Sequence, residues 1–323
     1  MILLWRTTSR CNYACGFCAY DRRLGGVRRE VIAEEAMRFG RLVAAWGRST
    51  GTRVLLSWLG GGEPMLWRPL LPLSAALHRE GGVAISATTN GSTLGRPAVR
   101  EAILASFAEL TVSVDGFAPT HDRLRGAPGG WARVRDGVVA LAGERARAGA
   151  RLRLRVNAVL MRSTAAAFSA LCEEVAEWGV DEITFNQLGG RDRPEFFPDE
   201  RLRPEDVARF AAALPGLRTR LERRGVRLCA DLRYVDRLAA SAAGRAVPAD
   251  ACRLGEDFLF VDEHGLVAPC SFSTADYGVP IADLRTVADL RALPARFARA
   301  HAAARCQTCD DCPSTHVFAK FAA

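Results

Sequence analysis

The sequence predicts an α/β fold, in which a partial barrel of six parallel strands is followed by a small cysteine-rich C-terminal domain. Over the first 190 residues, short β-branched or apolar runs alternate with longer helical patterns, as in strand–helix–strand units around a parallel sheet. Five of the ten cysteines then lie between positions 252 and 312. Because clustered cysteines inside cells hold metal more often than they form disulfides, this second part is predicted to bind metal.

The composition is that of a soluble globular protein. The chain has 323 residues, of which 49% are hydrophobic and 25% charged, and this suits one barrel-sized domain with an appendage. Neither a membrane-spanning run nor a signal peptide is visible, so we expect a cytoplasmic protein that binds no membrane. The net charge of +8 comes from arginines spread along the whole chain without a DNA-binding motif, so no nucleic acid is expected as a partner.

Six runs are predicted to form the barrel, with helices between them. Right-handed crossovers place the helices outside and direct the carboxyl ends of all strands towards one mouth. In the fifth strand, arginines alternate with apolar residues, which predicts a half-buried strand. The strands are expected at Ile2–Arg6, Arg53–Trp58, Val83–Thr88, Leu110–Val114, Leu152–Leu160 and Glu182–Gln187. The helices are expected at Arg29–Trp46, Arg96–Phe107, Val134–Ala148 and Ala165–Trp178.

The character of the sequence changes after Gln187. Three prolines within Gly189–Pro204 indicate a linker, and a helix over Glu205–Arg223 and a strand over Val226–Cys229 are expected to follow. A hairpin is predicted from Phe258 to Ala268, with the turn at residues 262–265. The expected domains are a core barrel at 1–190, a linker with a helical connection at 191–249, and the cysteine-rich domain at 250–323.

The first cysteine group, Cys11, Cys15 and Cys18, has the spacing C-x3-C-x2-C directly after the first strand. Three thiolates can hold three irons of a [4Fe-4S] cluster and leave the fourth iron open to another ligand. A structural zinc site needs four protein ligands, and no fourth Cys or His lies nearby in the sequence. The alternative is therefore a zinc loop that a distant residue completes.

Polar motifs follow the next strands in order, and together with the cysteines they resemble the radical S-adenosylmethionine (SAM) superfamily. Residues 60–64, GGGEP, resemble the GGE motif of this family. Residues 88–91 are similar to its TNG stretch, and residues 113–116 to its S-x-D-G stretch. The resemblance implies a partial TIM-like (βα)6 barrel whose cluster cleaves SAM to a 5′-deoxyadenosyl radical.

The same resemblance implies the roles of the residues at the barrel mouth. The glycines and the glutamate receive the methionine amino group of SAM, Ser113 and Arg125 hold its carboxylate, and Phe17 shields the adenine. Asn90 lies in the TNG stretch, and Asn157 matches a polar position of the fifth strand. The cofactor-binding candidates are Phe17, Gly61, Gly62, Glu63, Asn90, Ser113, Arg125 and Asn157.

The C-terminal cysteines resemble a twitch domain, the shortened relative of the SPASM domain, in which a hairpin and a downstream loop bind one auxiliary [4Fe-4S] cluster. Its metal candidates are Cys252, Cys270, Cys306, Cys309 and Cys312. Because one cubane needs four ligands, the expected set is Cys252, Cys270 and two of the last three. A structural zinc ion bound by four thiolates would satisfy the same spacing.

The resemblance leaves three reactions open: oxidation, with the auxiliary cluster as electron acceptor; epimerisation, quenched by a thiol; and a redox-neutral reaction such as decarboxylation or elimination. The candidate hydrogen donors are Cys172, Cys229 and Cys312. Only ten residues precede Cys11, whereas peptide-modifying relatives often carry a leader-binding domain there, so a small sugar- or aminocyclitol-like natural product is expected as substrate. The alternatives are a peptide-modifying maturase and, without catalysis, a zinc-stabilised binding protein. A flavodoxin or ferredoxin is the expected electron donor.

Overall fold

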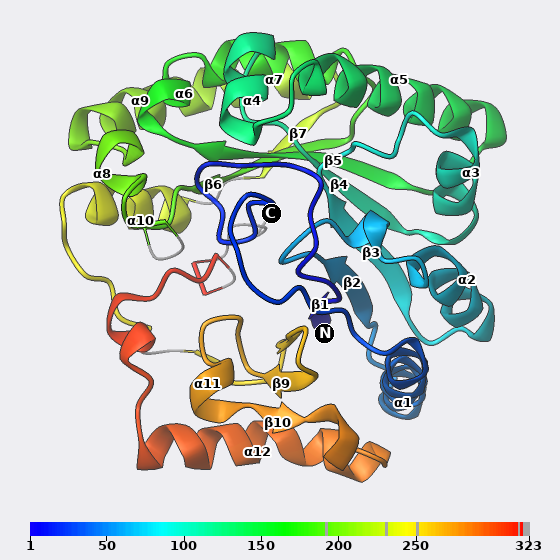
Figure 1. Ribbon diagram of the computed structural model, residues 1–323. Helices are drawn as coiled ribbons and strands as arrows, with labels where there is room; N and C mark the ends of the chain where they lie inside the picture. The colour runs from blue at the N-terminus through cyan, green and yellow to red at the C-terminus, as the bar shows by residue number, and fades with distance from the viewer. Residues whose placement is uncertain (191–192, 230–231, 250–251, 316, 319–323) are drawn as a thin grey trace.

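The computed structural model describes residues 1–190, 193–229, 232–249, 252–315 and 317–318. It confirms the α/β class: a curved sheet is lined on its outer side by an arc of helices (Figure 1). The sheet has ten strands in the order β10-β9-β8-β1-β2-β3-β4-β5-β6-β7, and the pairs from β1 to β7 are all parallel. This is the partial barrel that the sequence predicts.

The strands of the barrel agree closely with the predicted runs. They are β1 Ile2–Arg6, β2 Leu55–Leu59, β3 Ala84–Thr89, β4 Glu109–Ser113, β5 Arg153–Leu160, β6 Glu182–Gln187 and β7 Arg227–Cys229. The hairpin strands are β8 Phe258–Val261 and β9 Leu266–Ala268, and β10 Val279–Pro280 follows.

The helices differ more from the prediction, because four of those with eight residues or more, α2, α4, α10 and α12, were not predicted. The helices of eight residues or more are α1 Ala33–Thr50, α2 Leu70–Glu80, α3 Pro97–Ser106, α4 Ala118–Arg125, α5 Gly130–Ala148, α7 Phe168–Ala176, α9 Pro204–Glu222, α10 Leu232–Ala242 and α12 Val287–Ala303. Short helices are α6 Arg162–Ala165, α8 Phe197–Glu200 and α11 Thr274–Tyr277.

The first helix starts four residues later than predicted, because the residues before it pair with another segment of the chain. The amide of Ser9 donates to the Arg29 carbonyl at 2.9 Å, and Thr8 forms a β-bridge with Glu30. Residues 29–30 are therefore held in extended backbone against the segment that leads to the first cysteine, and α1 begins only at Ala33.

The arginines of β5 lie on the inner side of the sheet, where Arg155 is largely buried and Arg153, at the start of the strand, is half exposed. The apolar residues between them pack towards the helices, so alternation along the strand directs Arg153 and Arg155 to the opposite side. There Arg155 pairs with Glu182 and Glu109, and Arg227 of β7 also pairs with Glu182. The prediction of a half-buried strand is confirmed. On its polar side Arg155, Glu109, Glu182 and Arg227 form a cluster of charges inside the barrel, which we call the charged floor.

The C-terminal hairpin continues the barrel sheet. β8 pairs in parallel with β1, and Trp5 lies opposite Val261. The guanidinium of Arg38 in α1 also donates to the carbonyls of Leu284 and Ile281, at 2.8 and 2.6 Å. The expected domain boundaries, at 190/191 and 249/250, adjoin positions 191–192 and 250–251, which lie outside the described residues. In the described part of the chain, no helix combines the length and apolar character that crossing a membrane requires.

Candidate active site

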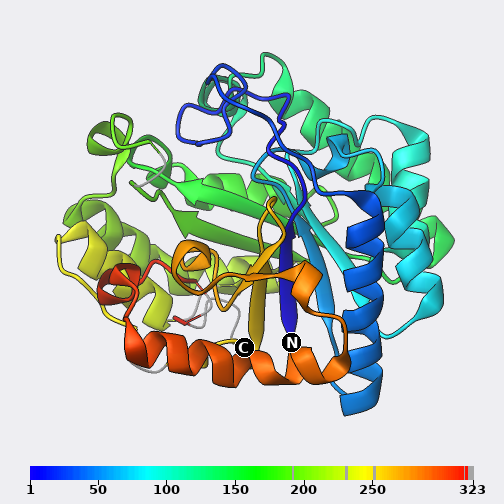
Figure 2. The same cartoon turned by 60° about the horizontal axis from the view of Figure 1, so that its bottom comes forward.

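The first three cysteines lie on a loop after β1 that projects beyond the carboxyl ends of the strands (Figure 2, dark blue). Burial raises the pKa of the Cys15 thiol to about 12, and the nearby thiols of Cys18 and Cys11 act in the same direction. The amides of Tyr13 and Tyr20 lie 3.4 Å from the Sγ atoms of Cys11 and Cys18, to which they donate. Three neighbouring sulfurs, two of which accept backbone N–H groups, fit the thiolate ligands of an iron–sulfur cluster.

Backbone hydrogen bonds fix this loop against the end of α4. The amide of Ala14 donates to the Arg125 carbonyl at 3.0 Å, and that of Gly16 donates to the Leu124 carbonyl at 3.2 Å. The loop passes so close to Gly126 that a Cβ there would stand 2.6 Å from the Ala14 carbonyl oxygen. The C-terminal end of α4 is therefore in direct backbone contact with the cysteine loop and holds it in place.

The glycine-rich stretch after β2 supports the same loop from the other side. The amides of Gly62 and Glu63 donate to the carbonyls of Thr8 and Arg10 at 2.9 and 2.7 Å. A Cβ on Gly62 would lie 1.8 Å from the Arg10 carbonyl oxygen, which no side chain can tolerate. The glycine at this position allows two backbone segments to touch.

The Glu63 carboxylate is buried and makes hydrogen bonds within the protein. It accepts from the Thr89 hydroxyl at 2.7 Å, the Asn90 amide at 2.6 Å and the Met65 amide at 3.0 Å. Burial raises the pKa of this carboxyl. Because a carboxylate offers about four acceptor positions, three bonds leave room for about one more donor, such as an amino group. Glu63 thus joins the ends of β2 and β3.

Asn90 lies directly beside the cysteine loop. Its Nδ2 donates to Asn12 Oδ1 at 2.9 Å and is 3.9 Å from the Sγ of Cys11. The amide group of Asn12 in turn donates to Ser92 Oγ at 2.9 Å. The TNG stretch and the first cysteine therefore belong to one network.

Arg125 is held by Asp115, a residue that was not among the site candidates. Its Nε donates to Asp115 Oδ2 at 2.7 Å, and its Nη2 lies 2.6 Å from the same oxygen in an ion pair. The other carboxylate oxygen accepts from the Val159 amide at 2.8 Å. Both side chains are buried, and the guanidinium lies 5.7 Å from the centre of the Phe17 ring. A signal for this pair exists in the sequence, since an Asp in the S-x-D-G stretch precedes the Arg by ten residues.

Ser113 and Asn157 are neighbours across the sheet. They lie opposite each other in the β4–β5 register, and both are partly exposed. They share the inward side of the sheet with Arg155, above the charged floor. The eight cofactor-binding candidates thus come from the cysteine loop and from the carboxyl ends of β2 to β5 and α4.

The five C-terminal cysteines also gather. Burial raises the pKa of Cys252 to about 11, and the thiols of Cys270 and Cys312 are near enough to contribute. Burial likewise raises the pKa of Cys309 to about 12, with contributions from Cys306, Cys270 and Cys312. Residues that are more than fifty positions apart in the chain therefore form one group of thiols.

Further contacts hold this second group in place. The Tyr277 hydroxyl accepts from the Cys306 amide at 2.6 Å, and Arg237 Nε donates to the Cys312 carbonyl at 2.9 Å. The Ser314 amide donates to the Sγ of Cys312 at 3.4 Å. Among the described residues, no three His, Cys, Asp or Glu side chains meet closely enough for a single metal ion. In a cubane each thiolate binds its own iron.

The three candidate hydrogen donors lie in different surroundings. Cys172 is buried in α7 within the core between helices and sheet. Cys229 is the last residue of β7, and alternation places it on the same inward side as Arg227. Cys312 belongs to the C-terminal group of thiols. The structure therefore brings Cys229 to the barrel interior and leaves Cys172 in the helical layer.

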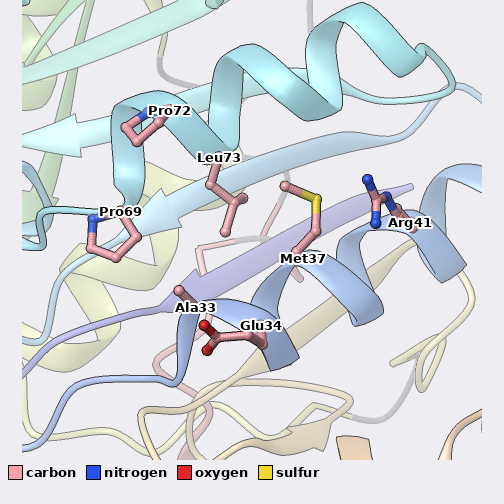
Figure 3. A pocket seen from close by; sticks show the side chains of 7 residues that line it. All are labelled: Ala33, Glu34, Met37, Arg41, Pro69, Pro72 and Leu73. Carbon is pink, nitrogen blue, oxygen red and sulfur yellow. The ribbon is translucent and has the colours of Figure 1, made fainter.

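A groove of about 440 Å³ lies on the outer side of the barrel, away from this site (Figure 3). It is formed between the first three turns of α1 and the start of α2. Its lining residues are Ala33, Glu34, Met37, Arg41, Pro69, Pro72 and Leu73. None of them is a candidate site residue.

Comparison with known proteins agrees with this geometry. Residues 5–145 match the Radical SAM superfamily. An AdoMet-dependent heme synthase of Methanosarcina barkeri is 33% identical over 141 residues, which are 43% of this chain and 38% of the relative. A PqqA peptide cyclase of Xanthomonas axonopodis pv. citri is 26% identical over 324 residues, which cover 98% of this chain and 80% of the cyclase. The structure of native anSMEcpe with bound AdoMet and Kp18Cys peptide aligns with a TM-score of 0.67 at 17% identity, over 97% and 88% of the two chains.

Residues 5–145 therefore match the radical SAM family, which agrees with the resemblance found in the sequence. The solved structures, at 17% identity, show that the fold is shared. Enzymes of this superfamily use a [4Fe-4S] cluster and SAM, and its SPASM-like members carry auxiliary clusters.

Proposed function

We propose that this radical SAM enzyme modifies a peptide. The observation that carries the proposal is the relative named PqqA peptide cyclase, which matches almost the whole chain and 80% of its own length. The sugar- or aminocyclitol-like substrate, the main expectation from the sequence, has no such support among the relatives, whereas the peptide alternative does. A peptide is therefore the substrate class that the observations favour.

In this proposal the residues at the mouth hold the cofactors. Cys11, Cys15 and Cys18 bind the [4Fe-4S] cluster, which, when bound and reduced, supplies the electron that cleaves SAM. Gly61, Gly62 and Glu63 receive its amino group, and the remaining acceptor position of the Glu63 carboxylate supports this assignment. The other contacts come from Phe17, Asn90, Ser113, Arg125 and Asn157.

Arg125 is oriented for such a contact by its partner. Asp115 takes the Nε and Nη2 donors, and neither bond uses Nη1. A guanidinium that is fixed on one edge already has its other edge oriented. Less side-chain conformational entropy is therefore lost on binding, which favours the binding of a carboxylate.

The C-terminal thiols are proposed to bind one auxiliary [4Fe-4S] cluster, through Cys252, Cys270 and two of Cys306, Cys309 and Cys312. Their gathering in one place supports this set. Such a cluster supplies an acceptor for an electron during a net oxidation. If the reaction is an epimerisation instead, Cys229 is the better placed of the two other thiols, because it lies on the inward side of the barrel.

An experiment on turnover tests the substrate class. The iron-loaded enzyme is incubated anaerobically in deuterated water with SAM, a reductant and a short precursor peptide encoded beside its gene, and the products are measured by mass spectrometry. A peptide two mass units lighter, formed in step with 5′-deoxyadenosine, indicates oxidation. A peptide that gains one deuterium at carbon indicates epimerisation. Modification of an amino sugar, with every tested peptide unchanged, would overturn the proposal.

A further inference from the structure

Three side chains connect the first cysteine loop to the C-terminal hairpin. Arg6 ends β1, Tyr20 lies two residues after Cys18, and Glu263 lies in the turn between β8 and β9. The Glu263 carboxylate accepts from Arg6 Nη1 at 3.0 Å with one oxygen and from the Tyr20 hydroxyl at 3.3 Å with the other. We call these three residues the Arg6–Glu263–Tyr20 bridge.

The bridge is packed as well as hydrogen-bonded. The Arg6 guanidinium lies 5.3 Å from the centre of the Tyr20 ring and 5.0 Å from that of Phe260 on β8. The side chains of Arg6 and Glu263 are 22% and 10% exposed, so little water competes with their ion pair. Removal of the carboxylate charge would leave Arg6 partly buried without its acid.

The backbone around the bridge is built to accommodate it. A Cβ on Gly61 would stand 2.4 Å from the Tyr20 ring and 2.7 Å from Arg6 Cδ, so this glycine provides the space for both side chains. On the other side, Asp262 Oδ1 accepts from the amides of His264 and Leu266, both at 2.9 Å. These bonds fix the turn that carries Glu263.

Short stretches of chain link each end of the bridge to a cysteine group. The Tyr20 amide donates to the Sγ of Cys18 at 3.4 Å. Beyond Glu263 the chain enters β9, and Cys270 follows two residues after that strand ends. A movement of either cysteine group would therefore strain the hydrogen bonds of Glu263.

We propose that the Arg6–Glu263–Tyr20 bridge fixes the position of the auxiliary thiols relative to the first cysteine loop. Glu263 and Tyr20 are then positioning residues, which touch neither cluster directly. The inference rests on the proposed function for the identity of the two clusters. The contact between the two parts of the chain rests on geometry alone.

The test compares two conservative variants with a matched control. Glu263→Gln keeps the shape but removes the charge, and Tyr20→Phe keeps the ring but removes the hydroxyl. Glu256→Gln is the control, because Glu256 pairs with Arg253 at 2.9 Å on the exposed surface of the same C-terminal region. Hydrogen exchange of the iron-loaded protein is measured over residues 11–24 and 258–272, and pulsed EPR measures the distance distribution between the reduced clusters.

We expect both segments to exchange at least tenfold faster in Glu263→Gln, with a smaller change in Tyr20→Phe and none in the control. The distance distribution should broaden in the same order, while each variant retains the iron content of the wild type. Faster exchange in only one segment, or equal changes in the control, would overturn the proposal. A wild-type protein with fewer than two clusters would instead contradict the two-cluster assignment made under the proposed function, and the exchange data would still decide the role of the bridge.

Discussion

Asp115 and Arg125 illustrate, at the scale of single residues, how the site depends on charges that are buried in pairs. Each is almost fully covered, and each also makes a backbone contact: the carboxylate accepts from the Val159 amide, and the Arg125 carbonyl accepts from the Ala14 amide. A buried ion pair adds little net stability, but a buried charge without its partner is costly. The pair is thus a sensitive position for mutation.

We therefore predict that Asp115→Asn destabilises the protein by about 3–5 kcal/mol, because it leaves the Arg125 charge buried without an acid. SAM binding should weaken as well, because an asparagine at this position no longer fixes the orientation of the Arg125 guanidinium as the aspartate does. Chemical denaturation and calorimetric titration with SAM measure the two effects. Asp136→Asn is the control, because Asp136 pairs with Arg135 on the exposed surface, and it should change neither quantity.

A second prediction concerns pH. His121 Nδ1 accepts from the Asp115 amide at 3.2 Å, which requires the neutral ring, and burial and the Arg125 charge lower the pKa of His121 to about 4. In the unfolded chain the pKa is about 6.5, so the unfolded state binds the proton first. The stabilisation is complete above pH 6.5 and is lost as the pH falls towards 4.

The expected loss between pH 7 and pH 5 is about 2 kcal/mol, observable as a lower melting temperature. His121→Gln should show a weaker dependence over this range, because glutamine does not titrate. An identical pH profile for the two proteins would contradict the assignment of the titrating group.

At the scale of elements, the exposed loop at residues 22–29 carries four arginines around two exposed apolar residues, Leu24 and Val27. It lies next to the first cysteine group. Arg28 is used to hold the loop, because its guanidinium donates to the carbonyls of Ser9, Asp21 and Leu24. A positive surface beside a redox centre favours encounter with an acidic protein.

We predict that this loop receives the electron donor, a flavodoxin or ferredoxin. Arg22→Glu/Arg29→Glu should raise the KM for an acidic protein donor at least tenfold, with a weaker salt dependence, and should change SAM cleavage with dithionite less than twofold. Arg296→Glu/Arg299→Glu on α12 changes the net charge equally at two exposed positions and is the control. A loss of peptide affinity with unchanged donor kinetics would show instead that the loop binds substrate.

Local patterns predicted the strands better than the contacts between elements. β1 and β6 have the expected bounds, because each is a short apolar or β-branched run between turn signals. α12 was missed although it spans 17 residues, since Pro294 interrupts its helical pattern. The arginine side of β5 was recognised, but only its acidic partners on β4 and β6 show that it faces the barrel interior.

The motifs in the sequence were enough to predict the residues of the candidate site. The hydrogen bonds between those residues could not be predicted. The cysteines, the glycines and the polar strand ends stand in an order that indicates a SAM-cleaving site. That Glu63 would bond to Thr89 and Asn90, and Glu263 to Arg6, depends on contacts between residues 26 to 257 positions apart. No periodicity along the chain encodes such contacts, so they appear only once the sheet is assembled.

At the scale of the whole molecule, the two cysteine groups lie in parts that share one sheet. If both bind cubanes, the protein should hold about eight irons per chain. Replacement of Cys11, Cys15 and Cys18 together by Ala should halve this number and abolish formation of 5′-deoxyadenosine, as iron analysis and chromatography would show. Full formation of 5′-deoxyadenosine by this variant would contradict the assignment of the first cluster, and four irons with one zinc in the wild type would contradict that of the second.

The pairing of β8 with β1 also affects the order in which the chain can assemble during its synthesis. One of the two neighbours of β1 begins only at Phe258, about 250 positions later in the chain. At about 5–20 residues per second, the ribosome needs roughly 13–50 seconds to produce that strand. During this interval one edge of β1 offers unpaired backbone N–H and C=O groups, next to the buried side chains of Leu3 and Trp5. The nascent barrel is therefore most exposed to mispairing at its oldest strand.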